Sequence, residues 1–326
     1  MSLAMIHGDK GLQESVRKVR FELEQRLKGQ EWVIEKVLVA FLGGGHLLLE
    51  GPPGVGKTSL ARALSEVFEG SFHRMQMTSD LLPSEIVGIL RPTRNGKDFE
   101  FRPGPIFGNF VLADELNRTS PKTQAALLEA MAEGTVTVDG HCYPLPNPFF
   151  VVATQNPFEY HGVYPLVESQ LDRFMLQVKV GLPDAEQEMR IYENGHSGTA
   201  TASRVGDTKR EGGTVIRIEH VKNIREEISR VHVSKPVLKY VHDLISQTRS
   251  HASVEAGVSV RGGLLFIQAL RAAAYIRGRD YVNPDDVADF AVPALAHRVR
   301  LGEGFSDWES KKKVIYDILE KAKKPA

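Results

Sequence analysis

The residues best suited to chemistry form a glycine-rich stretch in the first third of the chain. Residues 51–58 read GPPGVGKT and fit the pattern GxxxxGK[ST], in which backbone N–H groups wrap the phosphates of a nucleotide. Glycine suits such a loop because the backbone turns sharply and comes close to oxygen atoms. We expect Lys57 to reach the β- and γ-phosphates and Thr58 to place its hydroxyl on Mg²⁺. The residues expected to bind the nucleotide, ATP, are Gly51, Pro52, Pro53, Gly54, Val55, Gly56, Lys57, Thr58 and Ser59.

The sequence on either side of this stretch fits the same interpretation. Residues 46–50 are typical of a short buried strand, and residues 60–68 of a helix whose N-terminus would face the anion. The alternative is a glycine and proline turn beside a chance lysine, which requires neither a strand before it nor a helix after it. The coincidence of all three elements favours a phosphate-binding loop.

A second group of reactive side chains ends an apolar run at residues 110–115. Four apolar residues precede Asp114 and Glu115, which predicts a buried strand that brings two carboxylates to the sheet edge where α/β folds bind ligands. We expect Asp114 to hold Mg²⁺, directly or through water, and Glu115 to orient and deprotonate the attacking water. A solvated strand end is the alternative, but the phosphate-binding pattern in the same chain favours the catalytic interpretation.

Three further polar residues are candidates for the same site. Asn156 follows an apolar strand at residues 149–154 and is placed to hydrogen-bond the attacking water or the γ-phosphate; the alternative is an Asn-Pro turn without a ligand. Arg173 either pairs with a neighbouring acid or reaches a nucleotide on the next subunit, where a guanidinium stabilises transition-state charge. Arg261 lies in the first turn of a predicted helix, where a cation opposes the helix dipole, and this favours a phosphate ligand over a solvated arginine.

Alternating apolar strands and helices predict the elements that position these side chains. The pattern is typical of an α/β fold with a parallel sheet. Two hairpins are predicted as insertions, one turning at Asn95-Gly96 and the other at Asp139-Gly140. The second hairpin is either a pore or substrate element or only a long turn, and the sequence leaves both open. Between the hairpins, Ser120 is expected to cap a helix over residues 121–133.

Two amphipathic helices are predicted ahead of the first strand. The first spans residues 11–27, and the second begins at Gln30 and ends before three consecutive glycines at residues 43–45. The second helix carries one apolar stripe. Packing in the core is the favoured use of this stripe, and direct contact with adenine is the alternative.

The chain is predicted to contain two domains. Residues 1–182 form a P-loop core with an N-terminal helix, and residues 183–326 form an all-helical lid, because Gly181-Leu182-Pro183 marks a boundary and the later periodicity is helical. A helix over residues 184–194 begins the lid. It is followed by a polar segment over residues 195–213 that is expected to be mobile.

Composition limits the classes of function. The chain has 326 residues, enough for two domains, and its 41 lysines and arginines balance its 41 aspartates and glutamates, so no bulk positive field favours nucleic acid. The single cysteine, Cys142, excludes an intrachain disulfide and a cysteine-rich metal site. No apolar run resembles a signal peptide or a membrane helix, and we expect a cytoplasmic location.

Taken together, these motifs resemble those of the AAA+ ATPases. The strings LADELNRTSPKTQAALLEAMAEGTVTVDG and VVATQNPFEYHGVYPLVESQLDRF resemble the MoxR family in particular, which is similar to the ATPase subunits of magnesium chelatase; the likeness covers residues 29–301. By this resemblance Asn156 is sensor 1, Arg173 is the arginine finger and Arg261 is sensor 2. The family often has proline before the sensor 2 arginine, whereas Val260 stands there, a departure that could shift the start of the helix and the aim of Arg261.

The resemblance also implies partners and a function. It implies a ring-shaped homo-oligomer, commonly a hexamer, that acts with a partner carrying a von Willebrand factor A domain. The predicted function is ATP hydrolysis coupled to remodelling, maturation or metal insertion of a protein client, with lid rotation moving the two hairpins. One alternative is a nucleic-acid motor or loader on the same core, which the neutral composition disfavours. The other is a scaffold that binds nucleotide without hydrolysis, which the complete set of catalytic residue types disfavours.

Overall fold

The computed structural model of the chain describes residues 9–27, 29–52, 54–93, 95, 98–156, 162–181, 189, 216–302 and 307–325. Five of the predictions lie wholly or partly outside these residues: the place of Pro53, Gly96 of the first predicted hairpin turn, the domain boundary at residues 182 and 183, the segment over residues 195–213 and, Met189 apart, the helix over residues 184–194. No helix in the described ranges combines the length and the apolar character that crossing a bilayer requires.

Five parallel strands form the central sheet, in the order β2, β5, β8, β1, β9. Its middle strands, β5 and β8, are apolar and buried almost throughout, as expected for parallel strands covered by helices. Because all five strands run in the same direction, their C-terminal ends meet at one edge of the sheet. The strands are β1 (Leu47–Glu50), β2 (Phe72–Gln76), β5 (Phe110–Asp114), β8 (Phe150–Gln155) and β9 (Leu176–Lys179).

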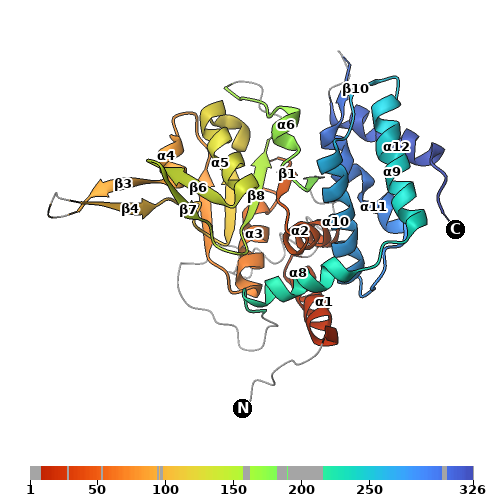
Figure 1. Cartoon of the computed structure of the whole chain (residues 1–326), viewed down its shortest axis with the longest axis horizontal. Coiled ribbons are helices and arrows are strands. Elements are labelled where there is room, and N and C mark those ends of the chain that lie inside the picture. The colour runs from red at the N-terminus through yellow and green to blue at the C-terminus, as the bar shows by residue number, and fades with distance from the viewer. Residues whose placement is uncertain are drawn as a thin grey trace.

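Helices cover both faces of this sheet (Figure 1). Successive side chains of a strand point to opposite faces, so Leu47 and Leu49 join the core formed with α2 and α3, whereas Leu48 joins the core formed with α5. Helix α5 begins as predicted, because the Ser120 side chain accepts a hydrogen bond from the backbone N–H of Thr123 and a proline follows it. The three helices are α2 (Glu31–Leu42), α3 (Lys57–Val67) and α5 (Pro121–Glu133).

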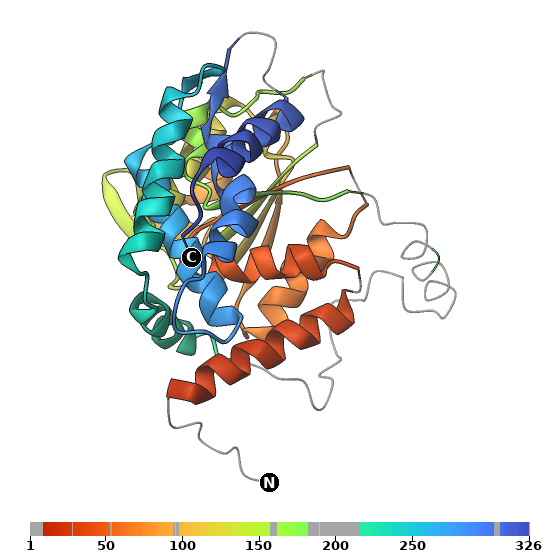
Figure 2. The same cartoon turned by 90° about the vertical axis from the view of Figure 1, so that its right-hand side faces the viewer.

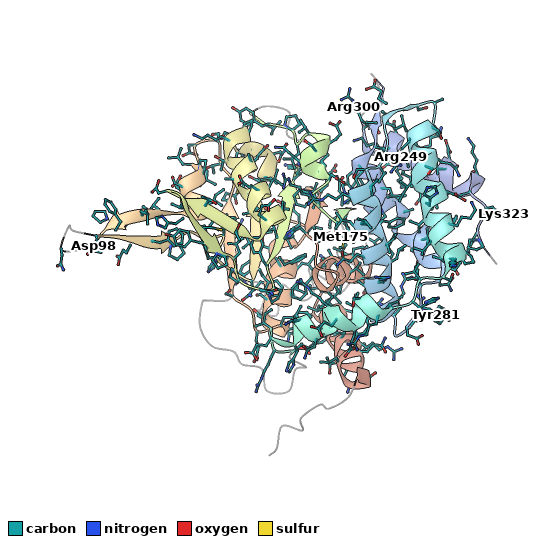
Figure 3. All side chains as sticks on the ribbon, viewed as in Figure 1. Asp98, Met175, Arg249, Tyr281, Arg300 and Lys323 are labelled. Atoms are coloured by element: carbon teal, nitrogen blue, oxygen red, sulfur yellow. The ribbon has the colours of Figure 1, made fainter. Side chains whose placement is uncertain are left out.

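Two antiparallel hairpins occupy the positions that the sequence predicts. Figure 1 shows the first of them extending away from the sheet, and Figure 3 places Asp98 at its outer end. Phe101 of the first hairpin stacks on Tyr143 of the second with 3.8 Å between ring centroids, so the hairpins are in direct contact. The short helix α4 (Pro83–Val87) leads into β3 (Gly88–Pro92) and β4 (Phe99–Pro103), and the second hairpin consists of β6 (Thr135–Val138) and β7 (His141–Pro144).

A helical lid lies on the side of the molecule opposite the first hairpin (Figure 1). Its helix α10 is capped by Ser259 and begins at Val260, so the valine at this position does not displace the predicted start. The lid was predicted to be entirely helical; the structure adds a two-stranded antiparallel sheet, supported by an ion pair between Arg300 and Glu255 at 2.9 Å. Its elements are α8 (His220–Arg230), α9 (Lys235–Ser250), β10 (Val254–Ala256), α10 (Val260–Ile276), α11 (Pro284–Leu295), β11 (Arg300–Leu301) and α12 (Trp308–Lys321).

The two N-terminal helices contact the lid as well as the part of the chain that contains the sheet. Helix α1 (Asp9–Arg26) runs below α2 in Figure 2, and its Gln13 side chain donates to the backbone carbonyl of Tyr275 in α10 at 3.1 Å. The apolar stripe of α2 lies in a hydrophobic core that includes residues of α10, which confirms its predicted packing role. The residues of the stripe are Val33, Ile34, Val37, Leu38 and Phe41.

Candidate active site

One cavity of about 350 Å³ lies at the edge of the sheet where the parallel strands end. Its lining comes from the loop after β1, the start of α3 and the ends of β2, β5 and β8, which is the position where α/β folds bind ligands. The structure therefore brings the phosphate loop, the acidic pair and Asn156 to one place. The lining residues are Gly54, Gly56, Lys57, Thr58, Ser59, Arg74, Gln76, Asp114, Glu115 and Asn156.

The phosphate loop has a backbone conformation that requires glycine. Gly54 and Gly56 have φ angles of +86° and +83°, in the left-handed region that other residues adopt only with strain. Gly51 meets a different constraint, because a Cβ atom there would lie 2.2 Å from the carbonyl oxygen of Val180. From the other side, the Gln30 side chain donates to the carbonyl of Val55 at 3.0 Å and holds the loop against α2.

The first turn of α3 faces the cavity. The helix begins at Lys57, so the backbone N–H groups of its first turn have no partner within the helix and point toward the ligand space, together with the positive end of the helix dipole. The Lys57 ammonium lines the same cavity and donates to the carbonyl of Gly51 at 2.8 Å. This arrangement concentrates positive charge and N–H donors where an anion would bind.

The two carboxylates are held in defined orientations at the end of β5. Asp114 accepts hydrogen bonds from the Thr154 hydroxyl on Oδ1 and from Arg74 on Oδ2, both at 2.7 Å. Glu115 accepts from Gln76 at 2.7 Å and from Arg118 at 2.9 Å.

The backbone of Glu115 is in an unusual conformation. Its φ angle is +60°, a left-handed value that costs a residue with a side chain about 1–3 kcal/mol, and its N–H donates to the Thr154 hydroxyl at 2.8 Å. Strained backbone of this kind persists where the surrounding structure fixes it, and it is often found at functional sites. Here it turns the chain so that both acidic side chains line the cavity.

Of the three remaining residues predicted from sequence, one lines the cavity and two do not. Asn156 is 8% exposed, directly follows β8 and lines the cavity. Arg173 is half-buried and donates to the backbone carbonyl of Leu128 in α5 at 3.0 Å, and Arg261 is exposed in the first turn of α10. Neither arginine is among the described residues that line this cavity.

Several residues that shape the site were missed by reasoning from sequence. Arg74 and Gln76 alternate in a strand that was predicted, and its end had to lie at the same sheet edge, so the signal for them was present. Thr154 ends an apolar strand and could have been noticed in the same way. Gln30 gave no local signal, because it contacts the loop from a position 25 residues earlier in the chain.

The chemistry of the lining suits a nucleotide with Mg²⁺. The Thr58 hydroxyl and the Asp114 carboxylate line one cavity, and hard oxygen donors of this kind are those that Mg²⁺ prefers. The glycine-rich loop and the helix N-terminus supply the donors that phosphates require. A P-loop next to an acidic strand end, on a five-stranded parallel sheet followed by a helical lid, defines the class of AAA+ ATPases.

Comparison with known proteins agrees with this class. Residues 46–176 match the family described as "ATPase family associated with various cellular activities (AAA)", and residues 246–318 match the AAA lid domain. The chain is 46% identical to the uncharacterized protein YeaC of Bacillus subtilis, with 81% of this chain and 80% of YeaC covered. It is 36% identical to the chaperone MoxR1 of Mycobacterium tuberculosis, with 96% of this chain and 84% of that protein covered.

A solved structure is similar over nearly its whole length. The crystal structure of a candidate ATPase from Cytophaga hutchinsonii superposes with a TM-score of 0.83 at 35% identity and covers 96% of this chain and 97% of its own. The chain belongs to the MoxR family of AAA+ ATPases.

Proposed function

We propose that this protein hydrolyses ATP in the cavity at the sheet edge. The observation that carries the proposal is that Lys57, Thr58, Asp114, Glu115 and Asn156 line the same cavity although they come from three separate parts of the chain. Phosphoryl transfer depends mainly on positioning and on stabilisation of charge, and these residues supply a phosphate cradle, a cation, a carboxylate base and an orienting amide.

Glu115 is the proposed general base. Water attacks the γ-phosphorus and forms a new P–O bond, the bond from the γ-phosphorus to the β,γ-bridging oxygen breaks, and the proton of the water passes to the Glu115 carboxylate. Gln76 and Arg118 orient this carboxylate, since both donate to its Oε2 atom. Asn156, which lines the same cavity, is proposed to hold the water or a γ-phosphate oxygen.

The charge that develops on the phosphates is stabilised by cations from several elements. Lys57 acts from the phosphate loop. Thr58 and Asp114 are suited to hold Mg²⁺, which supplies positive charge to the phosphate oxygens when bound. Thr154 and Arg74 hold the Asp114 carboxylate in place for this task.

Two arginines act from outside the chain's own cavity. We assign Arg173 as an arginine finger that reaches the nucleotide of a neighbouring subunit in a ring, and Arg261 as a lid residue that approaches the phosphates when the lid moves. The positions of both residues support this assignment, since neither lines the cavity of its own chain among the described residues.

The activity is expected to drive remodelling, maturation or metal insertion of a protein client, together with a partner that carries a von Willebrand factor A domain. The similarity to a protein named as a chaperone supports a protein client. The two hairpins are the proposed client contacts, and Phe99 near the end of the first is 69% exposed. Crosslinking from positions near Asp139 and Phe99 tests this role, and client contacts confined to the lid would contradict it.

Phosphate release by purified protein tests the proposed hydrolysis. Glu115→Gln is expected to bind ATP but to lose at least about 100-fold in turnover, because the amide does not accept the proton. Glu320→Gln, an exposed change on α12, serves as the matched control and should match the wild type. Equal turnover by Glu115→Gln and the wild type would refute the role of Glu115, and a wild type that binds ATP without releasing phosphate would indicate a scaffold.

A further inference from the structure

Arg298 is a buried arginine of the lid whose guanidinium has a complete set of partners. It lies in the 3₁₀ turn η2 (Ala296–Arg298) after α11 and is 4% exposed. A guanidinium has five N–H donors, and five hydrogen bonds are made here. One joins the carbonyl of Ala294 within the lid, and the other four cross to a single segment of the sheet domain.

That segment, residues 172–175, lies directly before β9 and contains Arg173. The Arg298 Nε atom donates to Asp172 Oδ1 at 2.7 Å, and its terminal nitrogens donate to the carbonyls of Phe174 at 2.6 Å, Met175 at 3.2 Å and Asp172 at 3.4 Å. Figure 3 labels Met175 where the sheet domain meets α10. Arg298 therefore fixes the backbone on either side of Arg173.

Two more lid residues hold the same segment. The Ser259 hydroxyl donates to Asp172 Oδ2 at 3.1 Å, and the His297 Nε2 atom lies 3.1 Å from the carbonyl of Phe174. Both oxygens of the Asp172 carboxylate are thus engaged by lid side chains. A core segment bonded in this way has to follow the lid when the lid moves, because buried polar groups that lose their partners are costly.

The contact also reaches the first turn of α10. Ser259 is the N-cap of this helix and accepts from the N–H of Gly262 at 2.9 Å. Gly262 packs on Arg298 so closely that a Cβ atom there would lie 2.7 Å from Arg298 Cδ. Arg261, between these two residues, therefore shares one rigid junction with Arg298 and with the segment that carries Arg173.

We propose that Arg298 is a positioning residue that couples the position of the lid to the position of Arg173. The inference rests on the proposed function, in which Arg173 acts on the nucleotide of a neighbouring subunit. When the lid of one subunit rotates, Arg298 carries residues 172–175 with it and changes how Arg173 is presented to the next subunit. The nucleotide state of one subunit thereby influences the hydrolysis rate of its neighbour.

Subunit mixing separates this role from a merely structural one. Arg298→Lys keeps the positive charge but loses the planar fork that makes the five contacts. It should bind ADP like the wild type and lose roughly tenfold to 100-fold in ATP turnover, the size of loss expected when a group is misplaced by about 1 Å. Adding Glu115→Gln subunits, which have an inactive cavity but an intact Arg173, should restore much of the turnover, because the variant's own cavity is intact. Arg300→Lys, an exposed change in the same part of the lid, is the matched control and should behave as the wild type.

A second mixture distinguishes the failure of this inference from the failure of the proposed function. Arg173→Ala mixed with Glu115→Gln should also regain turnover if Arg173 acts between subunits. If this mixture recovers and the Arg298→Lys mixture does not, or if Arg298→Lys alone turns over ATP normally, the coupling is overturned while the function of Arg173 stands. If neither mixture recovers, the action between subunits fails and the coupling fails with it. If Arg298→Lys has a lower melting temperature than the wild type, Asp172→Asn takes its place in the mixing experiment. This change is nearly isosteric and affects a less buried side chain.

Discussion

At the sheet edge, polar side chains from several strand ends face an open cavity, whereas at the junction between sheet and lid buried carboxylates are paired with arginines. At this edge, Arg74 and Arg118 contact the two carboxylates while each remains 49% exposed. Glu115 holds a strained backbone conformation there. These features suit a place where charge changes during a reaction, because exposed partners can rearrange at little cost.

The junction contains two buried carboxylates that share one arginine. Arg277 of the lid donates to Glu35 of α2 at 2.8 Å and to Asp286 of α11 at 2.6 Å, and the two carboxylates are 8% and 1% exposed. Burial by itself would raise the pKa of Glu35, but the hydrogen bond from Arg277 and the charges of Lys36 and Arg277 outweigh it and lower the pKa to about 2. The comparison indicates that removing Arg277 from its buried carboxylates should chiefly change stability and that substitutions in the cavity should chiefly change activity.

The largest effect is expected at the junction. Arg277→Met should lower the free energy of unfolding by about 3–5 kcal/mol, because the buried carboxylate of Glu35 loses both hydrogen bonds from its main partner and that of Asp286 loses one of its two arginines. Urea unfolding measures the loss. Arg230→Met, at an exposed position on α8, is the control and should stay within about 0.5 kcal/mol of the wild type. A loss below about 1 kcal/mol for Arg277→Met would contradict the role given to the junction.

The next effect concerns the cavity and should fall on activity. Lys57→Ala should reduce ATP turnover by about 10²–10³-fold, which corresponds to about 2.7–4 kcal/mol of transition-state stabilisation, because a cation is lost beside the developing phosphate charge. Its free energy of unfolding should change by no more than about 1 kcal/mol. Lys313→Ala, an exposed change on α12, controls for loss of a lysine. If Lys57→Ala lost much stability but kept its turnover, the cavity would have the structural role given to the junction.

The pH dependence of stability tests the effect of burial on two histidines. His46 is buried, its ring Nε2 atom lies 3.1 Å from the carbonyl of Met131, its Nδ1 atom accepts from the N–H of Val151 at 3.1 Å, and burial lowers its pKa from 6.5 to about 4. Below pH 6.5 the His46 imidazole is therefore protonated in the unfolded chain but stays neutral in the folded protein. The free energy of unfolding falls as the pH drops from about 6.5 to about 4. At pH 5 the loss relative to pH 7 is about 2 kcal/mol from this residue. His297, whose pKa burial also lowers well below its usual value, acts in the same direction.

Urea unfolding at a series of pH values measures this loss. His46→Gln should flatten the slope above pH 4.5, because glutamine has a donor and an acceptor but does not titrate. The contribution of Glu35 lies in a different range: its lowered pKa stabilises the fold above pH 4.5, and this stabilisation is lost as the pH falls toward 2. An unchanged slope in His46→Gln would show that His46 does not account for the acid sensitivity.

The difference between the two regions also explains what the sequence could predict. The elements around the cavity follow from local patterns: Ser120 caps α5, and the Asp139-Gly140 turn has φ angles of +48° and +80°, as hairpin turns of this type require. Because the strands are parallel, their C-terminal ends then lie at the same edge of the sheet. The same reasoning could have extended to Arg74 and Gln76, which alternate toward the end of a predicted strand.

The junction could not be predicted in this way. Arg298 contacts Asp172 across 126 positions of sequence, and Arg277 contacts Glu35 across 242. No spacing rule relates residues so far apart, because which charges pair depends on how two domains pack. Arg173 and Arg261 illustrate the limit. The sequence identified both as candidate site residues, but what surrounds them depends on the lid and, by our proposal, on a second subunit.

Gln30 joins the two regions and should give the smallest effect. It lies directly before α2, which carries Glu35 of the junction, and it donates to the carbonyl of Val55 in the phosphate loop. Gln30→Ala removes one hydrogen bond, so we expect ATP binding to weaken by about fivefold, or about 1 kcal/mol, and stability to fall by a similar amount. Gln25→Ala, an exposed change on α1, should alter neither. Nucleotide titration and urea unfolding of the two variants together measure the effect. A change in binding alone would show that Gln30 belongs with the cavity, and a change in stability alone would show that it belongs with the junction.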